Sequence, residues 1–263
     1  MKYILIRGGG DLASGVALRL YRAGFKPVIC ELPAPMAVRR TVSFSEAIYD
    51  GTVTIEGISA SHVGTVSEAF QLLEAGIIPV LVDPQAGILA TGKFFAMVDA
   101  RLLKKRTEFG LSPSPLVIGL GPGFICGENC HAVVETQRGH FLGRVYWKGS
   151  ASEDTGQPEG DPRRVFRAPV DGVMTAFCGI GEHVQQNQLI AEIEGVKITA
   201  PFGGVLRGLI RPGVWVRQGV KIGDIDPRDD ASYCCTVSDK ARAIGGGVLD
   251  AILFGMHSRP SDG

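Results

Sequence analysis

Short apolar runs alternate with segments of helical periodicity over the first 120 residues of the chain. The runs predict strands over Tyr3–Arg7, Pro27–Leu32, Ile78–Asp83, Phe94–Asp99 and Leu116–Leu120. The periodic segments predict helices over Leu12–Ala23, Ser67–Ala75 (capped by Ser67) and Leu102–Phe109, and residues 51–62 read as an extra strand pair. Nearly continuous apolar strands separated by helices favour a parallel sheet covered on both faces. The expected fold class is therefore α/β, beginning with a Rossmann-like parallel sheet domain.

An internal repeat follows the polar stretch 152–164. Ala168-Pro169 returns as Ala200-Pro201, and nine of the 27 positions from 168 to 194 are identical 32 residues later. Two copies of one β-unit, neither of which buries its apolar face alone, are expected to pair about a pseudo-two-fold axis. The last periodic segment, Ser238–Leu253, predicts a helix capped by Ser238. Its three consecutive glycines, Gly245 to Gly247, would allow close packing.

The repeated segment resembles a biotinyl/lipoyl-like domain, which implies a duplicated β barrel-sandwich fold. Carrier members of that group bear their prosthetic group on a hairpin lysine, and Lys197 is the lysine of the corresponding connector here. Its surroundings depart from the carrier pattern, so no biotin or lipoate is expected on it. The predicted organisation is a Rossmann-like nucleotide-binding domain (1–125), a connecting β segment (126–164), a barrel-sandwich hybrid domain (165–228) and a C-terminal helix with its tail (229–263).

Composition narrows the classes of function. Lys plus Arg and Asp plus Glu number 27 each, so the net charge gives no reason to expect nucleic acid or an anionic membrane as a partner. No apolar run reaches the roughly 18 residues of a membrane-spanning helix. The N-terminal run is too short for a signal peptide, and six scattered cysteines are typical of a reduced, cytoplasmic protein.

The loop after the first strand matches a dinucleotide fingerprint, with Gly8, Gly10 and Ala13 at the three small positions. Such a loop presents backbone N–H groups and a helix N-terminus to a pyrophosphate. An acidic residue about 20 positions on would accept from ribose hydroxyls, and Glu31 has that spacing. Asp11 is the unfavourable residue, because its charge would lie near the phosphates unless it caps the helix. The cofactor-binding candidates are Gly8, Gly9, Gly10, Asp11, Leu12, Ala13 and Glu31, and the alternative is a tight structural turn.

Other polar groups are candidates for the reaction or for ligand binding. Arg39 and Arg40 suit an anion, whereas Asp99 and Arg101 follow a predicted strand and would either contact a substrate or pair with each other. Cys126, Cys130 and His131 suggest thiol chemistry. However, the C-x3-C spacing matches no zinc or haem motif, so no metal is expected, and small buried cysteines are the alternative. Period-two alternation places His131 and Glu135 on one strand face, either as an acid/base pair or as a polar sheet surface.

Several long stretches resemble the YqeB-type proteins, the selenium-dependent molybdenum hydroxylase system family. They are "ILIRGGGDLASGVALRLYRAGF" (4–25), "RRTVSFSEAIYDG" (39–51), "PVLVDP" (79–84), "VDARLLKK" (98–105), "VIGLGPGF" (117–124), "HAVVETQRGHFLGRV" (131–145) and "SDKARAIGGGVLDAIL" (238–253). The resemblance implies an accessory role in maturing these enzymes, with a molybdenum hydroxylase or its maturation machinery as partner. It transfers no catalytic residues.

The expected function is therefore a maturation protein that binds NAD(P) or another nucleotide at the glycine loop. Two alternatives are an NAD(P)-dependent oxidoreductase acting on a small molecule and a non-catalytic adaptor that docks a partner through the repeated domain. A homo-oligomer is compatible with the sequence.

Overall fold

The structure is a computed structural model that describes residues 2–104, 110–111, 114–153 and 160–258. A central sheet of nine strands occupies the first part of the chain, in the order β3-β4-β5-β2-β1-β6-β7-β8-β9. Its strands are β1 (Tyr3–Arg7), β2 (Lys26–Glu31), β3 (Thr52–Ile55), β4 (Ile58–Val63), β5 (Ile78–Val82), β6 (Phe94–Asp99), β7 (Leu116–Leu120), β8 (Ala132–Val134) and β9 (Val145–Tyr146). The strands from β4 to β8 run parallel, whereas β3 and β9 are antiparallel to their neighbours.

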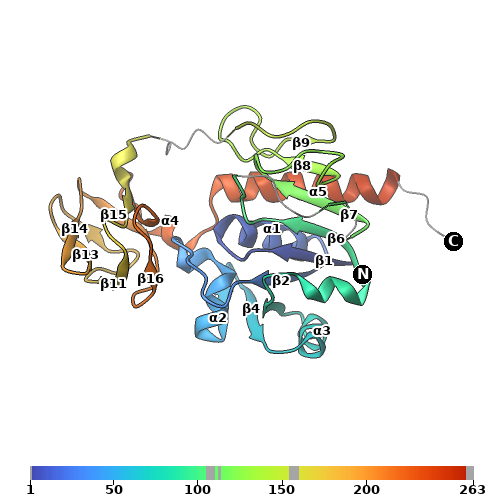
Figure 1. Cartoon of the computed structure of the whole chain (residues 1–263), viewed down its shortest axis with the longest axis horizontal. Coiled ribbons are helices and arrows are strands. Elements are labelled where there is room, and N and C mark those ends of the chain that lie inside the picture. Colours follow the sequence, from blue (N-terminus) through green and yellow to red (C-terminus); the bar gives the residue numbers. More distant parts are fainter. Residues whose placement is uncertain (1, 105–109, 112–113, 154–159, 259–263) are drawn as a thin grey trace.

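Helices cover both faces of this sheet. α1 (Asp11–Arg22) and α5 (Asp239–Ser258) lie side by side on one face, and α3 (Val66–Glu74) lies on the other (Figure 1). Alternate side chains of β1 serve the two faces, because Ile4 and Ile6 pack under α1 while Leu5 points toward the opposite core. α1 and α5 approach closely because Gly15 has no side chain. A Cβ there would lie 2.7 Å from that of Ala241.

The repeats form a second lobe, β10 to β17, beside the central sheet (Figure 1). One four-stranded sheet has the order β10-β17-β15-β12 and the other has the order β14-β13-β11-β16. The strands are β10 (Val165–Arg167), β11 (Gly172–Ala176), β12 (His183–Val184), β13 (Leu189–Ile193), β14 (Val196–Thr199), β15 (Gly204–Leu209), β16 (Trp215–Val216) and β17 (Lys221–Asp226). The first copy gives its short strand β12 to the sheet of the second, and the second copy gives β16 to the sheet of the first. The copies therefore enclose one shared core.

The predicted fold class, a Rossmann-like parallel sheet followed by a duplicated barrel-sandwich domain, is wrong. The central sheet is mixed, because antiparallel strands form both of its edges. The strand beside β2 is β5, whereas β4, the next parallel strand in the chain after β2, lies beyond β5. β5 connects to β6 through a 3-10 helix, Gly87–Thr91, while α5 from the far end of the chain covers the sheet beside α1. In the second lobe, both sheets are antiparallel, and one of them adds β10 from outside the repeat. Periodicity predicts where strands occur, but it does not predict which strands pair.

Individual elements differ less from expectation. The strand pair in residues 51–62 is present as the β3–β4 hairpin. Ser238 accepts from Ala241 N at 3.1 Å, as its role as helix cap requires. α3 is capped by Thr65 instead of Ser67, in a capping box with Glu68. Leu102 and Leu103 are not helical, and residues 105–109 of that predicted helix lie outside the described residues. No helix in the described part of the chain is long and apolar enough to cross a membrane.

Candidate anion-binding site

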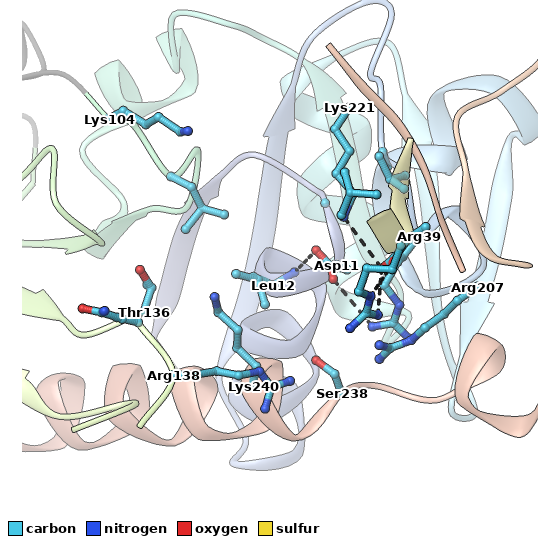
Figure 2. Close-up of a pocket in the computed structure, with 18 of the residues that line it drawn as sticks. Asp11, Leu12, Arg39, Lys104, Thr136, Arg138, Arg207, Lys221, Ser238 and Lys240 are labelled. Atoms are coloured by element: carbon cyan, nitrogen blue, oxygen red, sulfur yellow. Dashed lines mark hydrogen bonds and ion pairs between the residues drawn. The ribbon is translucent and has the colours of Figure 1, made fainter. Parts of the chain in front are cut away.

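A pocket of about 700 Å³ lies where α1 begins, between the central sheet and the repeat lobe. The described residues that line it include eight basic and three acidic side chains. Lys104, Arg138 and Lys240 come from the central-sheet side, and Lys221 comes from the repeat side (Figure 2). Arg164 ends the 3-10 helix before β10, and Arg167 lies in β10, so both also belong to the repeat side. Arg39 and Arg207 lie next to one another near the start of α1 and are called the arginine pair below. The acidic residues are Asp11, Glu153 and Asp224. Because basic groups predominate, the pocket favours an anionic ligand.

Arg39 is held from behind by backbone carbonyls. Its Nη2 donates to the carbonyl oxygens of Tyr233 at 2.8 Å and Thr236 at 3.1 Å, so the guanidinium has a fixed position. The side chain is 8% exposed, and its Nε has no hydrogen-bond partner among the described residues. An N–H group this deeply buried normally has an acceptor, so burying this one carries a cost in free energy.

Arg207 is buried to the same degree and comes from β15 of the repeat lobe. Its Nη1 lies 3.4 Å from Asp226, and its Nε also lacks a partner within the described ranges. Asp226 is engaged mainly by Arg228, which donates to it at 2.9 Å and 2.6 Å. Burial first, and then the charge of Arg39, lower the pKa of Arg207. The cost of holding two guanidinium groups together in this way would be relieved by a bound anion.

Asp11 lies between the helix and the arginine pair. Its Oδ1 accepts from Leu12 N at 2.9 Å, and its Oδ2 lies 3.6 Å from Nη1 of Arg39 (Figure 2). Asp11 is the first residue of α1 and not its cap, because Gly10 is the N-cap residue and no side chain in the described part of the chain accepts a capping hydrogen bond. Its carboxylate is instead accommodated by the first-turn amide of Leu12, by the helix dipole and by Arg39.

The glycine loop itself is largely covered by protein. Gly9 N donates to Oε2 of Glu31 at 2.6 Å, and Gly9 O accepts from Ser45 N at 2.9 Å. Gly8 N donates to the carbonyl oxygen of Cys30. Glu31 also accepts from Leu32 N, and burial raises the pKa of its carboxyl despite these hydrogen bonds. Of the seven predicted cofactor-binding residues, Gly10, Asp11 and Leu12 line the pocket. Gly8, Gly9, Ala13 and Glu31 belong to the packed turn.

The predicted charged candidates are mostly engaged within the fold. Arg40 donates to the carbonyl oxygen of Leu209 at 2.7 Å and so joins the central sheet to the repeat lobe. Asp99 is fully buried and accepts from Arg101 at 2.9 Å and 2.6 Å. Of the two alternatives for Asp99 and Arg101, the structure shows the one in which they pair with each other. Of the four charged candidates, Arg39 is the one in the pocket lining.

The cysteine and histidine candidates lie outside the pocket lining. Cys126 and Cys130 form a β-bridge with each other, and Cys130 is fully buried. His131 accepts from Val117 N through Nδ1. Glu135 accepts from Ser152 N and Oγ, and together with other backbone donors these hydrogen bonds lower its pKa although burial alone would raise it. No group of three or more His, Cys, Asp or Glu side chains in the described residues is arranged to hold a metal ion.

Sequence reasoning missed Arg207, and a signal for it exists. Arg207 is the single charged residue in the buried strand GVLRGL, and the position 32 residues earlier in the first repeat is Thr175. A charged residue that is present in only one copy of a repeat, within an apolar strand, indicates that this copy needs a charge at that position. The other missed lining residues, including Arg138, Arg164 and Lys240, stand in ordinary polar contexts and carry no such signal.

Comparison with known proteins gives one close relative. The chain is 47% identical over 258 residues to "Uncharacterized protein YqeB" of Escherichia coli (strain K12), an alignment that covers 97% of this chain. The chain is a homologue of YqeB. It spans about half (48%) of the length of that relative. This identity confirms the resemblance to YqeB-type proteins. It does not test the role in the maturation of selenium-dependent molybdenum hydroxylases. No family profile matches the chain.

Solved structures give weaker likenesses. A succinylglutamate desuccinylase from Silicibacter sp. is 15% identical with a TM-score of 0.26, and the alignment covers 85% of this chain and 84% of that one. An aspartoacylase family protein from Mesorhizobium loti is 11% identical with a TM-score of 0.29 and the same coverage. Because the TM-scores are this low, these likenesses support neither a fold assignment nor an activity for this chain.

Proposed function

We propose that the protein binds a phosphate-bearing small molecule in the interdomain pocket and acts as an accessory protein in the maturation of selenium-dependent molybdenum hydroxylases. The binding proposal rests on one observation: Arg39 and Arg207, each about nine-tenths buried, lie side by side in the pocket lining, close enough for the charge of Arg39 to lower the pKa of Arg207. The maturation role rests on the family resemblance of the sequence. The homology to YqeB supports the family and carries no role of its own.

Phosphate fits the arginine pair better than a single carboxylate would. A terminal phosphate carries nearly two negative charges and three acceptor oxygens, so it can contact two guanidinium groups at once. The pocket volume of about 700 Å³ lies within the roughly 300–1,000 Å³ of typical small-molecule sites. Nucleotides, including NAD(P), are the first ligands to test. Because the glycine loop is covered, their phosphates are expected on the arginine pair.

The test is calorimetric titration and thermal-shift measurement with inorganic pyrophosphate, AMP, ATP, NAD and NADP. A ligand at 100 times its dissociation constant should add about 2.7 kcal/mol to the free energy of unfolding. Arg207→Gln should weaken binding by about thirtyfold, because it removes charge-assisted hydrogen bonds worth about 2 kcal/mol. Its fold should persist, since Asp226 keeps both hydrogen bonds from Arg228.

The matched control is Arg163→Gln, next in sequence to a pocket residue. Arg163 is exposed and pairs with Asp161 outside the lining, so its loss should leave the dissociation constant unchanged. Equal weakening by the two variants would show that only net charge matters. Absence of a shift with every ligand would refute the binding proposal.

An exposed apolar face favours a second candidate function, the adaptor. Val173 pairs with Trp215 across β11 and β16, and Phe177 follows on the same face. Their exposed fractions are 44%, 53% and 53%. We propose that this face contacts the molybdenum hydroxylase partner. Purified hydroxylase should bind the protein, and Trp215→Ser should abolish that binding while sparing pyrophosphate binding. Undiminished hydroxylase binding by Trp215→Ser would contradict the proposal.

A further inference from the structure

Asp11 makes the two contacts that an anionic ligand would make at this site. Its carboxylate accepts from the first-turn amide of Leu12 at 2.9 Å and lies 3.6 Å from Arg39. Helix N-termini and guanidinium groups are the commonest protein partners of phosphate. The carboxylate is 34% exposed at the pocket wall, so it has room to move away.

One carboxylate does not satisfy the site. Asp11 supplies a single charge to Arg39, whereas the carboxylate paired with Arg207 belongs to Asp226. A group that carries more charge and more oxygens than Asp11 would gain contacts that Asp11 does not make.

We propose that Asp11 is an internal counter-anion, which occupies the anion subsite of Arg39 and the α1 N-terminus until a ligand displaces it, and so determines which ligands bind. This inference rests on the proposed phosphate site. A monoanionic carboxylate would only exchange one single charge for another at Arg39. A terminal phosphate or pyrophosphate would reach Arg207 as well, so the selected ligand class is a molecule with a multiply charged phosphate end.

The experiment measures pyrophosphate and acetate binding to wild type and to Asp11→Asn by calorimetry at low salt. Asn keeps an Oδ1 acceptor for Leu12 N, so the first turn of α1 should keep this hydrogen bond. Removing the competing charge should tighten pyrophosphate binding by about tenfold, a modest share of the attraction between unit charges at this separation. Acetate should bind measurably only to the variant.

Glu153→Gln is the matched control, because it removes the same charge from another wall of the same pocket. It should change pyrophosphate binding by less than about twofold, since solvent screens charges that lie apart. Unchanged or weaker binding by Asp11→Asn, or an equal gain in Glu153→Gln, would overturn the inference. If Asp11→Asn lowers the melting temperature, Asp11→Ser, which also offers an acceptor oxygen to the first turn, replaces it under the same criteria.

The experiment distinguishes the role of Asp11 from the phosphate site itself. If wild type binds pyrophosphate and Arg207→Gln binds it more weakly, the phosphate site is supported, whatever the result for Asp11→Asn. No binding by wild type or by Asp11→Asn would reject both.

Discussion

The glycine turn next to the pocket and the arginine pair in the pocket lining differ in how their charged groups are satisfied. In the turn, Glu31 accepts from Gly9 N and Leu32 N, so its carboxylate has partners within the turn itself. In the pair, Arg39 and Arg207 keep buried donors without acceptors in the described structure. The satisfied carboxylate belongs to a sequence motif, whereas the unsatisfied donors lie where no motif is present. Substitutions of groups that are satisfied within the fold should therefore affect stability, and substitutions at the arginine pair, or at Asp11 beside it, should affect binding.

The largest effect is expected from Asp99, whose charge is satisfied within the fold and outside the pocket lining. It is fully buried, binds Arg101 twice and lies 3.9 Å from Arg7. Asp99→Asn would leave buried guanidinium charge uncompensated and should lower the free energy of unfolding by about 3 kcal/mol. Urea denaturation measures this change. Asp161→Asn breaks an exposed pair with Arg163 and should leave the midpoint unchanged. A loss of pyrophosphate binding in Asp99→Asn without a loss of stability would break the comparison.

The next largest effect is expected from Asp226, which contributes to stability and also lies beside Arg207 of the arginine pair. Burial alone would raise its pKa, but the hydrogen bonds from Arg228 lower it to about 2 from an ordinary 3.8. A carboxyl with a depressed folded-state pKa contributes stability that is present above the unfolded value and lost as the pH falls through the folded value. Unfolding measured between pH 5 and pH 2 should therefore show a loss of about 2 kcal/mol from this group.

Arg228→Gln should remove most of that acid dependence. It should also weaken pyrophosphate binding, because Asp226 would then be free to neutralise Arg207, which lies 3.4 Å away. An unchanged acid transition would show that Arg228 does not lower the pKa. Unchanged pyrophosphate affinity would show that Arg207 can bind the ligand whether or not Arg228 engages Asp226.

Much of the local structure could be predicted from the sequence, because it depends on local patterns. The strands Tyr3–Arg7, Phe94–Asp99 and Leu116–Leu120 have the predicted bounds, and the glycines of the last helix do permit close packing, with Gly245 close to Gly15. The sheet order was not predictable, because β5 beside β2 depends on pairing between distant segments. Arg39 was predicted as an anion ligand. Its partner Arg207 lies 168 positions away, and only folding brings the two together.

The smallest expected effect tests the motif itself. Glu31 has the spacing of a ribose-binding residue, but its carboxylate accepts from Gly9 N at 2.6 Å and Leu32 N at 2.7 Å. Glu31→Gln should lower the free energy of unfolding by about 1 kcal/mol, because an amide is a weaker acceptor for two backbone donors than a carboxylate. NAD affinity should stay within about twofold of wild type, since a ribose would have to compete with the turn for this side chain. If NAD binding instead fell tenfold at unchanged stability, the glycine loop would be the binding wall and the comparison would be reversed.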